Sequence, residues 1–159
     1  MVAGLRLGRE QPRGLDRFGT AQAVGQSGQA VAQHFGAKRA LRLDLDGVIV
    51  GGTASVSSLL GRPLADLIGT EVKPLIHPDD LDPASGIWVD VLAKPDQSQT
   101  VRIRLQHADG TWRWFHDTAW NALDDPDTPG ILSEFHDIHA LVEAEQALHA
   151  SELGFRTLA

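Results

Sequence analysis

Residues Val101 to His139 read VRIRLQHADGTWRWFHDTAWNAL, then DDPDTPG, then ILSEFHDIH, and this stretch decides the fold. Its first run alternates apolar and polar side chains, which is the period of a half-buried strand. Asp109-Gly110 separates two such runs, and this pair favours a tight hairpin because glycine tolerates a positive φ. Segment 124–130 predicts a loop, and Ile131 to Ile138 forms the third run. The stretch therefore predicts an antiparallel three-strand meander with one face on a core.

The middle run carries large aromatic side chains on both of its expected faces. Alternation along a strand places Trp112, Trp114 and Trp120 on one face. Phe115 and Ala119 fall on the opposite face. Both faces therefore offer apolar surface.

A first hairpin is predicted upstream of this meander. Leu41, Leu43 and Leu45 alternate with polar residues, and Asp46-Gly47 then turns the chain into segment 48–50. Together with the meander, this gives five antiparallel strands.

Short helices are predicted between the two groups of strands. Thr53 can cap a helix over 54–60 that ends at Gly61, and Pro63 suits the first turn of a helix that ends at Gly69. A helical turn begins at Pro78, and the longest internal helix runs over 82–93. The apolar face of this longest helix comprises Ile87, Trp88, Val91 and Leu92.

The two ends of the chain differ from the middle. Residues 1–18 lack periodicity and are expected to be a flexible leader, and apolar residues between Ala21 and Phe35 predict a helical cap over 19–38. Residues 139–159 contain strong helix formers and predict an outgoing helix from about His139 to Leu153.

Composition is that of a globular protein. The chain has 159 residues, with 42% hydrophobic and 22% charged side chains, and no cysteine. No apolar run approaches the roughly 18 residues of a membrane span, and the N-terminus lacks the apolar core of a secretory signal. Residues 1–40 hold six basic and two acidic residues within a chain of net charge −7, so the remainder is strongly acidic. We therefore expect a cytoplasmic location and neither nucleic acid nor membrane as a partner; the alternative is that the basic leader contacts nucleic acid or anionic lipid.

Five motifs in order carry a resemblance to a known family. Arg104-Leu105 with Asp109-Gly110-Thr111-Trp112-Arg113-Trp114, and Phe135-His136-Asp137-Ile138-His139, resemble the C-terminal half of a PAS domain. The Asp46-Gly47 hairpin, the segment LGRPLADLIG at 60–69 and the segment IHPDD at 76–80 resemble its upstream motifs, including the His-Pro-Asp-Asp turn of one subgroup. The resemblance spans residues 41 to 139. It implies an α+β fold, with a five-stranded antiparallel sheet and short helices on one face, as a PAS domain over 39–138.

The resemblance also implies a role. PAS domains act as sensory and dimerisation modules in intracellular signal-transduction proteins, and a ligand- or partner-induced change would pass through Asp137 and Ile138 into the C-terminal signalling helix. Residues 151–159, SELGFRTLA, resemble the start of a following PAS domain, so we expect excision from a multidomain protein with an effector domain. A homodimer through the helical extensions is expected. The alternative is a ligand-free, constitutive protein–protein docking module that uses the exposed sheet face.

The resemblance to PAS domains also implies a cavity between the sheet and the long helix, which could hold a ligand. Apolar walls with few polar groups are typical of small-ligand pockets, although the same side chains also suit an ordinary core. The candidate lining residues are Trp88, Val91, Leu92, Ile103, Leu105, Trp114 and Trp120.

The cofactor expectations follow from residue types that are missing from the chain or from its longest internal helix. The absence of cysteine excludes flavin–cysteinyl chemistry, and the absence of histidine from 82–93 argues against haem by comparison with haem-binding PAS domains. No cofactor is assured; a non-covalent flavin or a small metabolite remains open. No nucleophile or phosphate-binding motif is present, so no catalytic residue is assigned, and a small α+β enzyme is the third class.

The histidines and several acidic residues allow both structural and functional interpretations. His107 and His116 flank the Asp109-Gly110 hairpin and could pair across it, but the seven histidines follow no fixed metal-ligand spacing, so no metal site is assigned. Helix capping accounts for Asp79, Asp80 and Asp82 better than a cation site does. Asp137 is expected both to cap the outgoing helix and, from the resemblance, to couple it to the sheet.

Overall fold

A computed structural model describes residues 39–158 of the chain, with side chains as far as Gly154. Five antiparallel strands form one sheet in the order β2-β1-β5-β4-β3. Their bounds are β1 Ala40–Leu43, β2 Ile49–Gly52, β3 Gln99–Gln106, β4 Trp112–Asn121 and β5 Ile131–Asp137. The expected hairpin and meander are both present. The predicted leader (1–18) and helical cap (19–38) lie outside the described residues.

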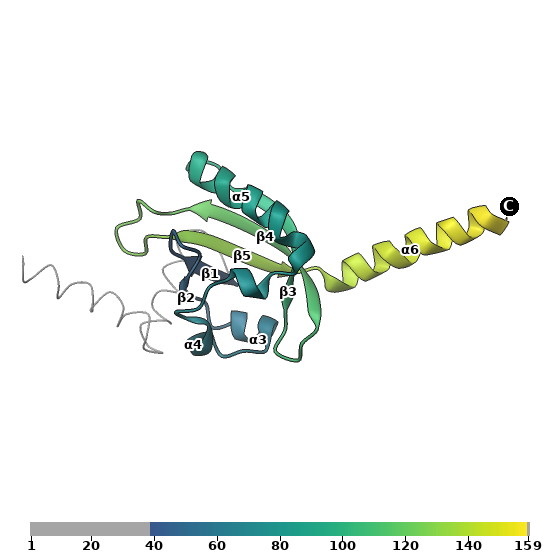
Figure 1. Ribbon diagram of the computed structural model, residues 1–159, viewed down its shortest axis with the longest axis horizontal. Coiled ribbons are helices and arrows are strands. Elements are labelled where there is room, and N and C mark those ends of the chain that lie inside the picture. Colours follow the sequence, from purple (N-terminus) through teal and green to yellow (C-terminus); the bar gives the residue numbers. More distant parts are fainter. Residues whose placement is uncertain (1–38, 159) are drawn as a thin grey trace, which may run out of the picture.

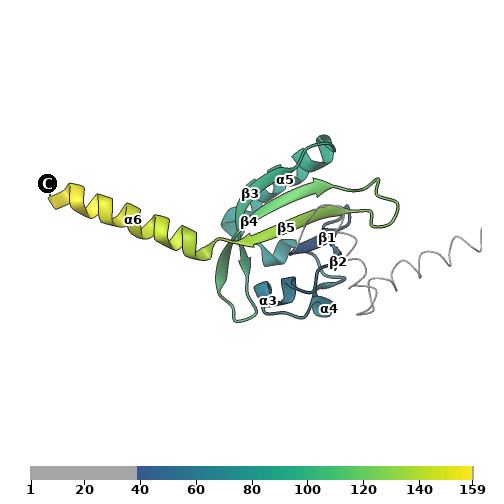
Figure 2. The same ribbon diagram turned by 180° about the vertical axis from the view of Figure 1, so that it is seen from behind.

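Helices connect β2 to β3 and pack against one face of this sheet (Figure 1). In chain order they are α3 Val56–Leu60, α4 Leu64–Leu67, the 3-10 turns η1 Lys73–Leu75 and η2 Pro78–Asp80, and α5 Leu81–Ala93. The last helix, α6 His139–Leu158, leaves the end of β5 and projects away from the sheet, as the view from behind also shows (Figure 2). The expected PAS-like α+β architecture is confirmed.

Several predicted boundaries are corrected. Strand β1 stops at Leu43 because the Asp44 carboxylate accepts the backbone N–H groups of Asp46 and Val48 at 2.9 and 3.0 Å, which closes the turn and leaves Leu45 exposed. The Thr53 hydroxyl does not cap a helix; it accepts the backbone N–H of Ala40 at 3.0 Å. Helix α3 consequently begins at Val56.

Two further helix ends differ from expectation. Helix α5 begins at Leu81, one residue before the predicted start. Helix α6 continues through Gly154 to Leu158, because a single glycine costs a helix only about 1 kcal/mol.

The main core lies between the helices and the inner face of the sheet, which we define as the face toward α5. Alternation directs Leu41, Ile103, Phe115 and Phe135 to this face, where they are buried against side chains of α3, α4 and α5. Phe115 and Phe135 meet edge to face at 6.2 Å between ring centroids. A smaller apolar group covers part of the outer face and consists of Ala40, Ala122, Leu132 and Trp120.

A buried ion pair joins the His-Pro-Asp-Asp turn to β3. The Asp80 carboxylate accepts the backbone N–H of Arg104 at 2.8 Å and two guanidinium N–H groups at 2.9 Å each. Burial raises the pKa of Asp80, but the hydrogen bonds and charge of Arg104 outweigh it and hold that pKa below the ordinary value. The capping role predicted for Asp80 is therefore wrong, since its side chain makes no cap hydrogen bond to α5.

Candidate functional site

A small internal hollow lies between α5 and the inner face of the sheet, and we call it the α5 hollow. Its volume is about 60 Å³, which is room for a molecule of a few non-hydrogen atoms. The lining is apolar except for two side chains, Asp117 and Ser133. The remaining lining residues are Leu43, Val72, Ile76, Ala84, Ile87, Trp88, Val91, Val101, Ile103, Leu105, Ala119 and Phe135.

The structure brings four of the seven expected lining residues together here. Trp88 and Val91 reach the α5 hollow from the helix, and Ile103 and Leu105 reach it from β3. Counted from Ala84, the next apolar residues of α5 follow at i+3, i+4 and i+7: Ile87, Trp88 and Val91. This spacing puts them on one stripe of the helix, which faces the sheet.

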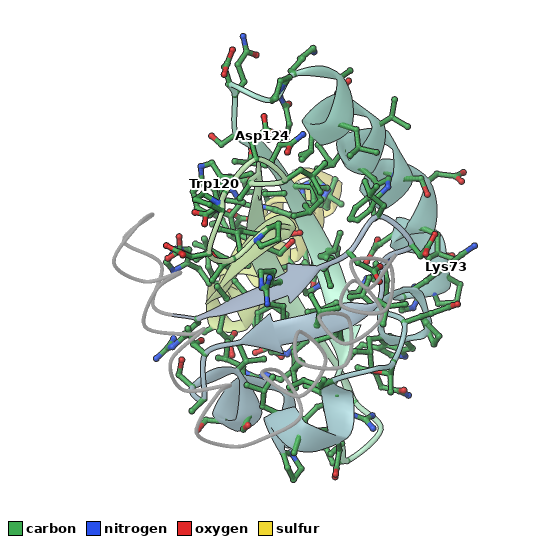
Figure 3. The ribbon with its side chains drawn as sticks, turned by 90° about the vertical axis from the view of Figure 1, so that its left-hand side faces the viewer. Lys73, Trp120 and Asp124 are labelled. Atoms are coloured by element: carbon green, nitrogen blue, oxygen red, sulfur yellow. The ribbon has the colours of Figure 1, made fainter. Side chains whose placement is uncertain are left out.

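The expectation is corrected for the other three residues. Leu92 is 36% exposed, because the position after Val91 turns away from the sheet. Trp114 and Trp120 lie on the outer face, since Phe115, Asp117 and Ala119 occupy the inward positions of β4. The guanidinium carbon of Arg104 sits 4.6 Å from the ring centre of Trp114. Figure 3 shows Trp120 on the opposite side of the molecule from Lys73.

Asp117 is the residue that sequence reasoning missed. It lies on β4 between Phe115 and Ala119, on the inward alternation, and its buried Oδ1 has no hydrogen-bond partner in the part of the chain that the structure describes. Burial raises the pKa of this carboxyl to about 7, although a hydrogen bond from the Ser133 side chain partly opposes the shift. A charged residue at an inward position of the predicted strand was the available signal.

The two predicted relay residues, Asp137 and Ile138, lie with His139 at the junction of β5 and α6, and we call these three residues the β5–α6 joint. Asp137 accepts the backbone N–H of His139 at 2.9 Å and pairs with the guanidinium of Arg113 at 3.0 Å. The backbone N–H of Ile138 donates to the Trp114 carbonyl at 3.0 Å. The Trp114 N–H in turn donates to Nδ1 of His139 at 3.2 Å. Two hydrogen bonds thus hold the start of α6 to Trp114 of β4.

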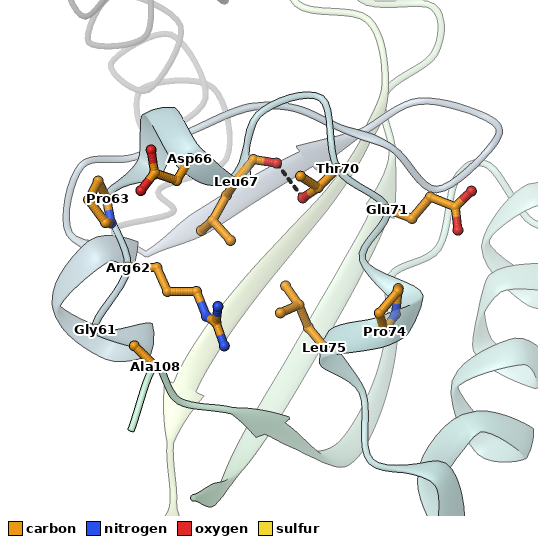
Figure 4. A pocket seen from close by; sticks show the side chains of 10 residues that line it. All are labelled: Gly61, Arg62, Pro63, Asp66, Leu67, Thr70, Glu71, Pro74, Leu75 and Ala108. Carbon is orange, nitrogen blue, oxygen red and sulfur yellow. Dashed lines mark hydrogen bonds between the residues drawn. The ribbon is translucent and has the colours of Figure 1, made fainter. Parts of the chain in front are cut away.

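A larger and more open hollow, of about 450 Å³, lies beside α3 and α4 (Figure 4). The Arg62 guanidinium points into it between Leu75 and Ala108, and its Nε is buried without a partner. Asp66 and Glu71 stand at the rim, and their carboxylates point away from the centre. These acidic groups offset the charge of Arg62, so the hollow has no clear preference for an anion.

The histidine pair suggested by the sequence does not form. In the β3–β4 register Arg102 faces His116, while His107 lies at the turn beside Asp109. His116 instead faces His136 of β5. Among residues 39–158, no group of three or more histidine or acidic side chains is arranged to hold a metal ion. In the same part of the chain, no helix combines the length and apolar character needed to span a membrane.

Comparison with known proteins identifies the family. The model of the PAS fold family matches residues 50–130, just over half of the 159-residue chain. The chain therefore belongs to the PAS fold family, whose members generally serve as sensory or protein-interaction modules rather than as enzymes. No curated protein matches the chain.

Solved structures agree at the level of the fold. The PAS-B domain of Drosophila melanogaster Cycle with bound ethylene glycol has a TM-score of 0.56 at 13% identity, covering 63% of this chain and 99% of that one. A PAS domain from Colwellia psychrerythraea gives a TM-score of 0.56 at 22% identity, covering 64% and 86%. The PAS domain of an HTR-like protein from Haloarcula marismortui gives 0.55 at 15% identity, covering 71% and 96%.

Proposed function

We propose that this chain is a ligand-sensing module of an intracellular signalling protein. A small molecule in the α5 hollow alters the packing of β5, and the β5–α6 joint passes that change into α6 and on to an output domain. The observation that carries this proposal is the layout of β5. Ser133 and Phe135 line the α5 hollow, and Asp137, on the same alternation, begins the joint.

The path between hollow and helix is short and well packed. Phe115 is fully buried, meets Phe135 edge to face, and pairs in register with Asp137. Since core side chains are close-packed, a shift of Phe135 must be accommodated by Phe115 or by β5 itself. Either response moves the backbone to which Asp137 belongs.

Helix α6 is placed to receive such a movement. Its first turn is held to Trp114 of β4 through Ile138 and His139, and Val142 is buried. One turn further, Glu145 pairs with Arg102 of β3 at 2.9 Å. A ligand can bias this arrangement only through different affinities for two packings of the joint.

Pairing of α6 with a second copy completes the proposal. Leu141 and Leu148 lie seven residues apart and are 49% and 63% exposed, a spacing suited to a helix–helix seam. Figures 1 and 2 show that α6 projects clear of the sheet. A two-fold dimer through this seam would couple the β5–α6 joints of both copies to the same pair of helices.

Light scattering on the full chain tests the dimer. We expect the L141E/L148E variant to be a monomer under conditions in which the wild type is a dimer. Val89→Glu is the matched control, because Val89 is 64% exposed on a different helix. Equal masses for wild type and L141E/L148E contradict helix pairing.

Native mass spectrometry and an absorbance spectrum of purified protein test for a ligand. A bound flavin or small metabolite supports sensing, with the limited volume of the α5 hollow favouring the small metabolite. The second candidate is a constitutive docking module, which the same limited volume favours. Ligand-free protein whose α6 resonances respond to no small molecule supports docking.

A further inference from the structure

Asp117 is a buried carboxyl for which residues 39–154 supply no cation. Within the described side chains, 39–154, its Oδ1 has no hydrogen-bond partner, and Asp117 is the one ionisable residue of that range in the lining of the α5 hollow. Burying an unpaired carboxylate costs several kcal/mol, so a cationic partner would strongly stabilise the ionised form of Asp117.

The neighbouring elements do not supply that partner. On β3, Arg102 pairs with Glu145 and Arg104 pairs with Asp80, both on alternate positions that face away from the hollow. On α5, Asp90 pairs with Lys94 near the surface at 3.7 Å. On β5, Glu134 and His136 occupy the outward positions and lie 3.5 Å apart.

The rest of the hollow suits a cation with a hydrocarbon body. Trp88 presents an indole to the same space, and aromatic rings attract ammonium groups through their electron-rich faces. The aliphatic side chains of Val91 and Ile103 form further walls, and the volume of about 60 Å³ restricts the body to a few carbons. Ser133 lines the same space and partly opposes the rise in the pKa of the Asp117 carboxyl.

We infer that the α5 hollow selects short-chain primary amines, with Asp117 pairing with the ammonium group and Trp88 covering it. The inference rests on the proposed function in taking this hollow as the ligand site. It adds the chemical class of the ligand and the residue that recognises its charge.

Three probes of similar size compare a cationic, a neutral and an anionic head group in the α5 hollow. They are propylammonium, propan-1-ol and propionate. Each is titrated into the full chain and followed by calorimetry and by amide NMR resonances of β4 and α5. We expect propylammonium to bind more tightly than propan-1-ol by about tenfold, the effect of one favourable charge interaction of about 1.4 kcal/mol. Propionate should not bind, because its carboxylate would face that of Asp117. Equal binding of propylammonium and propan-1-ol, or no binding of propylammonium, overturns the inference.

Asp117→Asn tests the recognising residue while keeping its shape. We expect the variant to lose the preference for propylammonium over propan-1-ol, while Asp90→Asn, an acidic position outside the hollow, keeps it. A D117N variant that keeps the preference contradicts the assignment.

The wild-type chain gives a second measure that does not depend on any variant folding. Propylammonium affinity should rise between about pH 6 and pH 8 as Asp117 ionises, whereas that of propan-1-ol should not. A flat profile for propylammonium overturns the inference.

The α6 resonances separate this inference from the proposed function. Amine-selective binding that leaves α6 unchanged supports the inference and contradicts the relay. Binding of propan-1-ol without amine preference, accompanied by changes in α6, supports the relay and overturns the inference.

Discussion

Asp80 and Asp117 are both buried carboxyl groups, but they have opposite surroundings. Asp80 receives three hydrogen bonds from Arg104, which hold its pKa below the ordinary value against the effect of burial. Among residues 39–154, the Oδ1 of Asp117 has no hydrogen-bond partner and the carboxyl has no cation, and burial raises its pKa to about 7. The first arrangement fastens the His-Pro-Asp-Asp turn to the sheet. The surroundings of Asp117 place a buried carboxyl beside the α5 hollow with no cation from residues 39–154. This is the reason to regard Asp117 as functional.

The largest effect is expected from Asp117→Asn, through the pH dependence of stability. The raised pKa means that folded protein holds the proton more tightly, so wild-type stability falls as pH rises from about 4 to about 7 and is then level. The asparagine side chain does not ionise, so the variant does not lose stability in this way. The free energy of unfolding of the variant minus that of the wild type should therefore increase by on the order of 4 kcal/mol between about pH 4 and about pH 7. Urea denaturation at several pH values measures it, and a difference that does not change with pH contradicts the environment described for Asp117.

The next largest effect is expected from Arg104→Gln, with the opposite sign. Removing the guanidinium leaves Asp80 buried and uncompensated, which should destabilise the fold by about 3 kcal/mol near neutral pH. Because the pKa of Asp80 is held below the ordinary value of about 4 in the wild type, this loss should shrink as pH falls through that value and vanish only at lower pH, where Asp80 is protonated in the wild type as well.

The same denaturation series measures the Arg104→Gln effect. Arg102→Gln on the same strand is the control, because its pair with Glu145 is exposed. A loss no greater than that of the control would show that the Asp80 pair does not hold the turn.

The contrast between these two acids marks the limit of sequence reasoning. Alternation along 101–123 placed Phe115 and Ala119 together on one face, and that face is buried as the pattern requires. The same alternation places Asp117 between them, but a charge at a strand position is also compatible with an edge or a bulge. The packing of α5, β3 and β5 around Asp117 decides between these, because it surrounds the carboxyl with apolar side chains and leaves Oδ1 without a partner among residues 39–154.

The tryptophans were misplaced for a related reason. Periodicity groups Trp114 and Trp120 correctly but does not say which face of the sheet the helices cover. Likewise the partner of Asp80 lies 24 residues away on β3. Local capping rules could not find it.

A smaller effect is expected from Asp137→Ala at the β5–α6 joint. Asp137 satisfies one backbone N–H at the start of α6 and pairs with Arg113, so its loss should cost about 1 kcal/mol. The more telling readout is hydrogen exchange, which should accelerate in the first turns of α6 while β4 stays protected.

Arg113→Ala separates the two contacts of Asp137 by removing the ion pair and keeping the backbone hydrogen bond. Equal exchange in α6 for wild type and D137A would show that the joint does not hold the helix.

The smallest effect is expected from Glu145→Gln. This exposed pair with Arg102 lies beyond the buried Val142, so we expect no measurable change in melting temperature. A change as large as that of Asp137→Ala would place the mechanical attachment of α6 further along the helix than the joint.

The central claim is that Asp117 is a buried acid whose cationic partner is a ligand. The chemical shift of its side-chain carboxyl carbon reports the ionisation of this acid directly. A ¹³C NMR titration of the full chain should give a pKa of about 7 for Asp117, and addition of propylammonium should lower it. A titration at the ordinary value for aspartate, or a raised value that propylammonium does not change, would contradict the account.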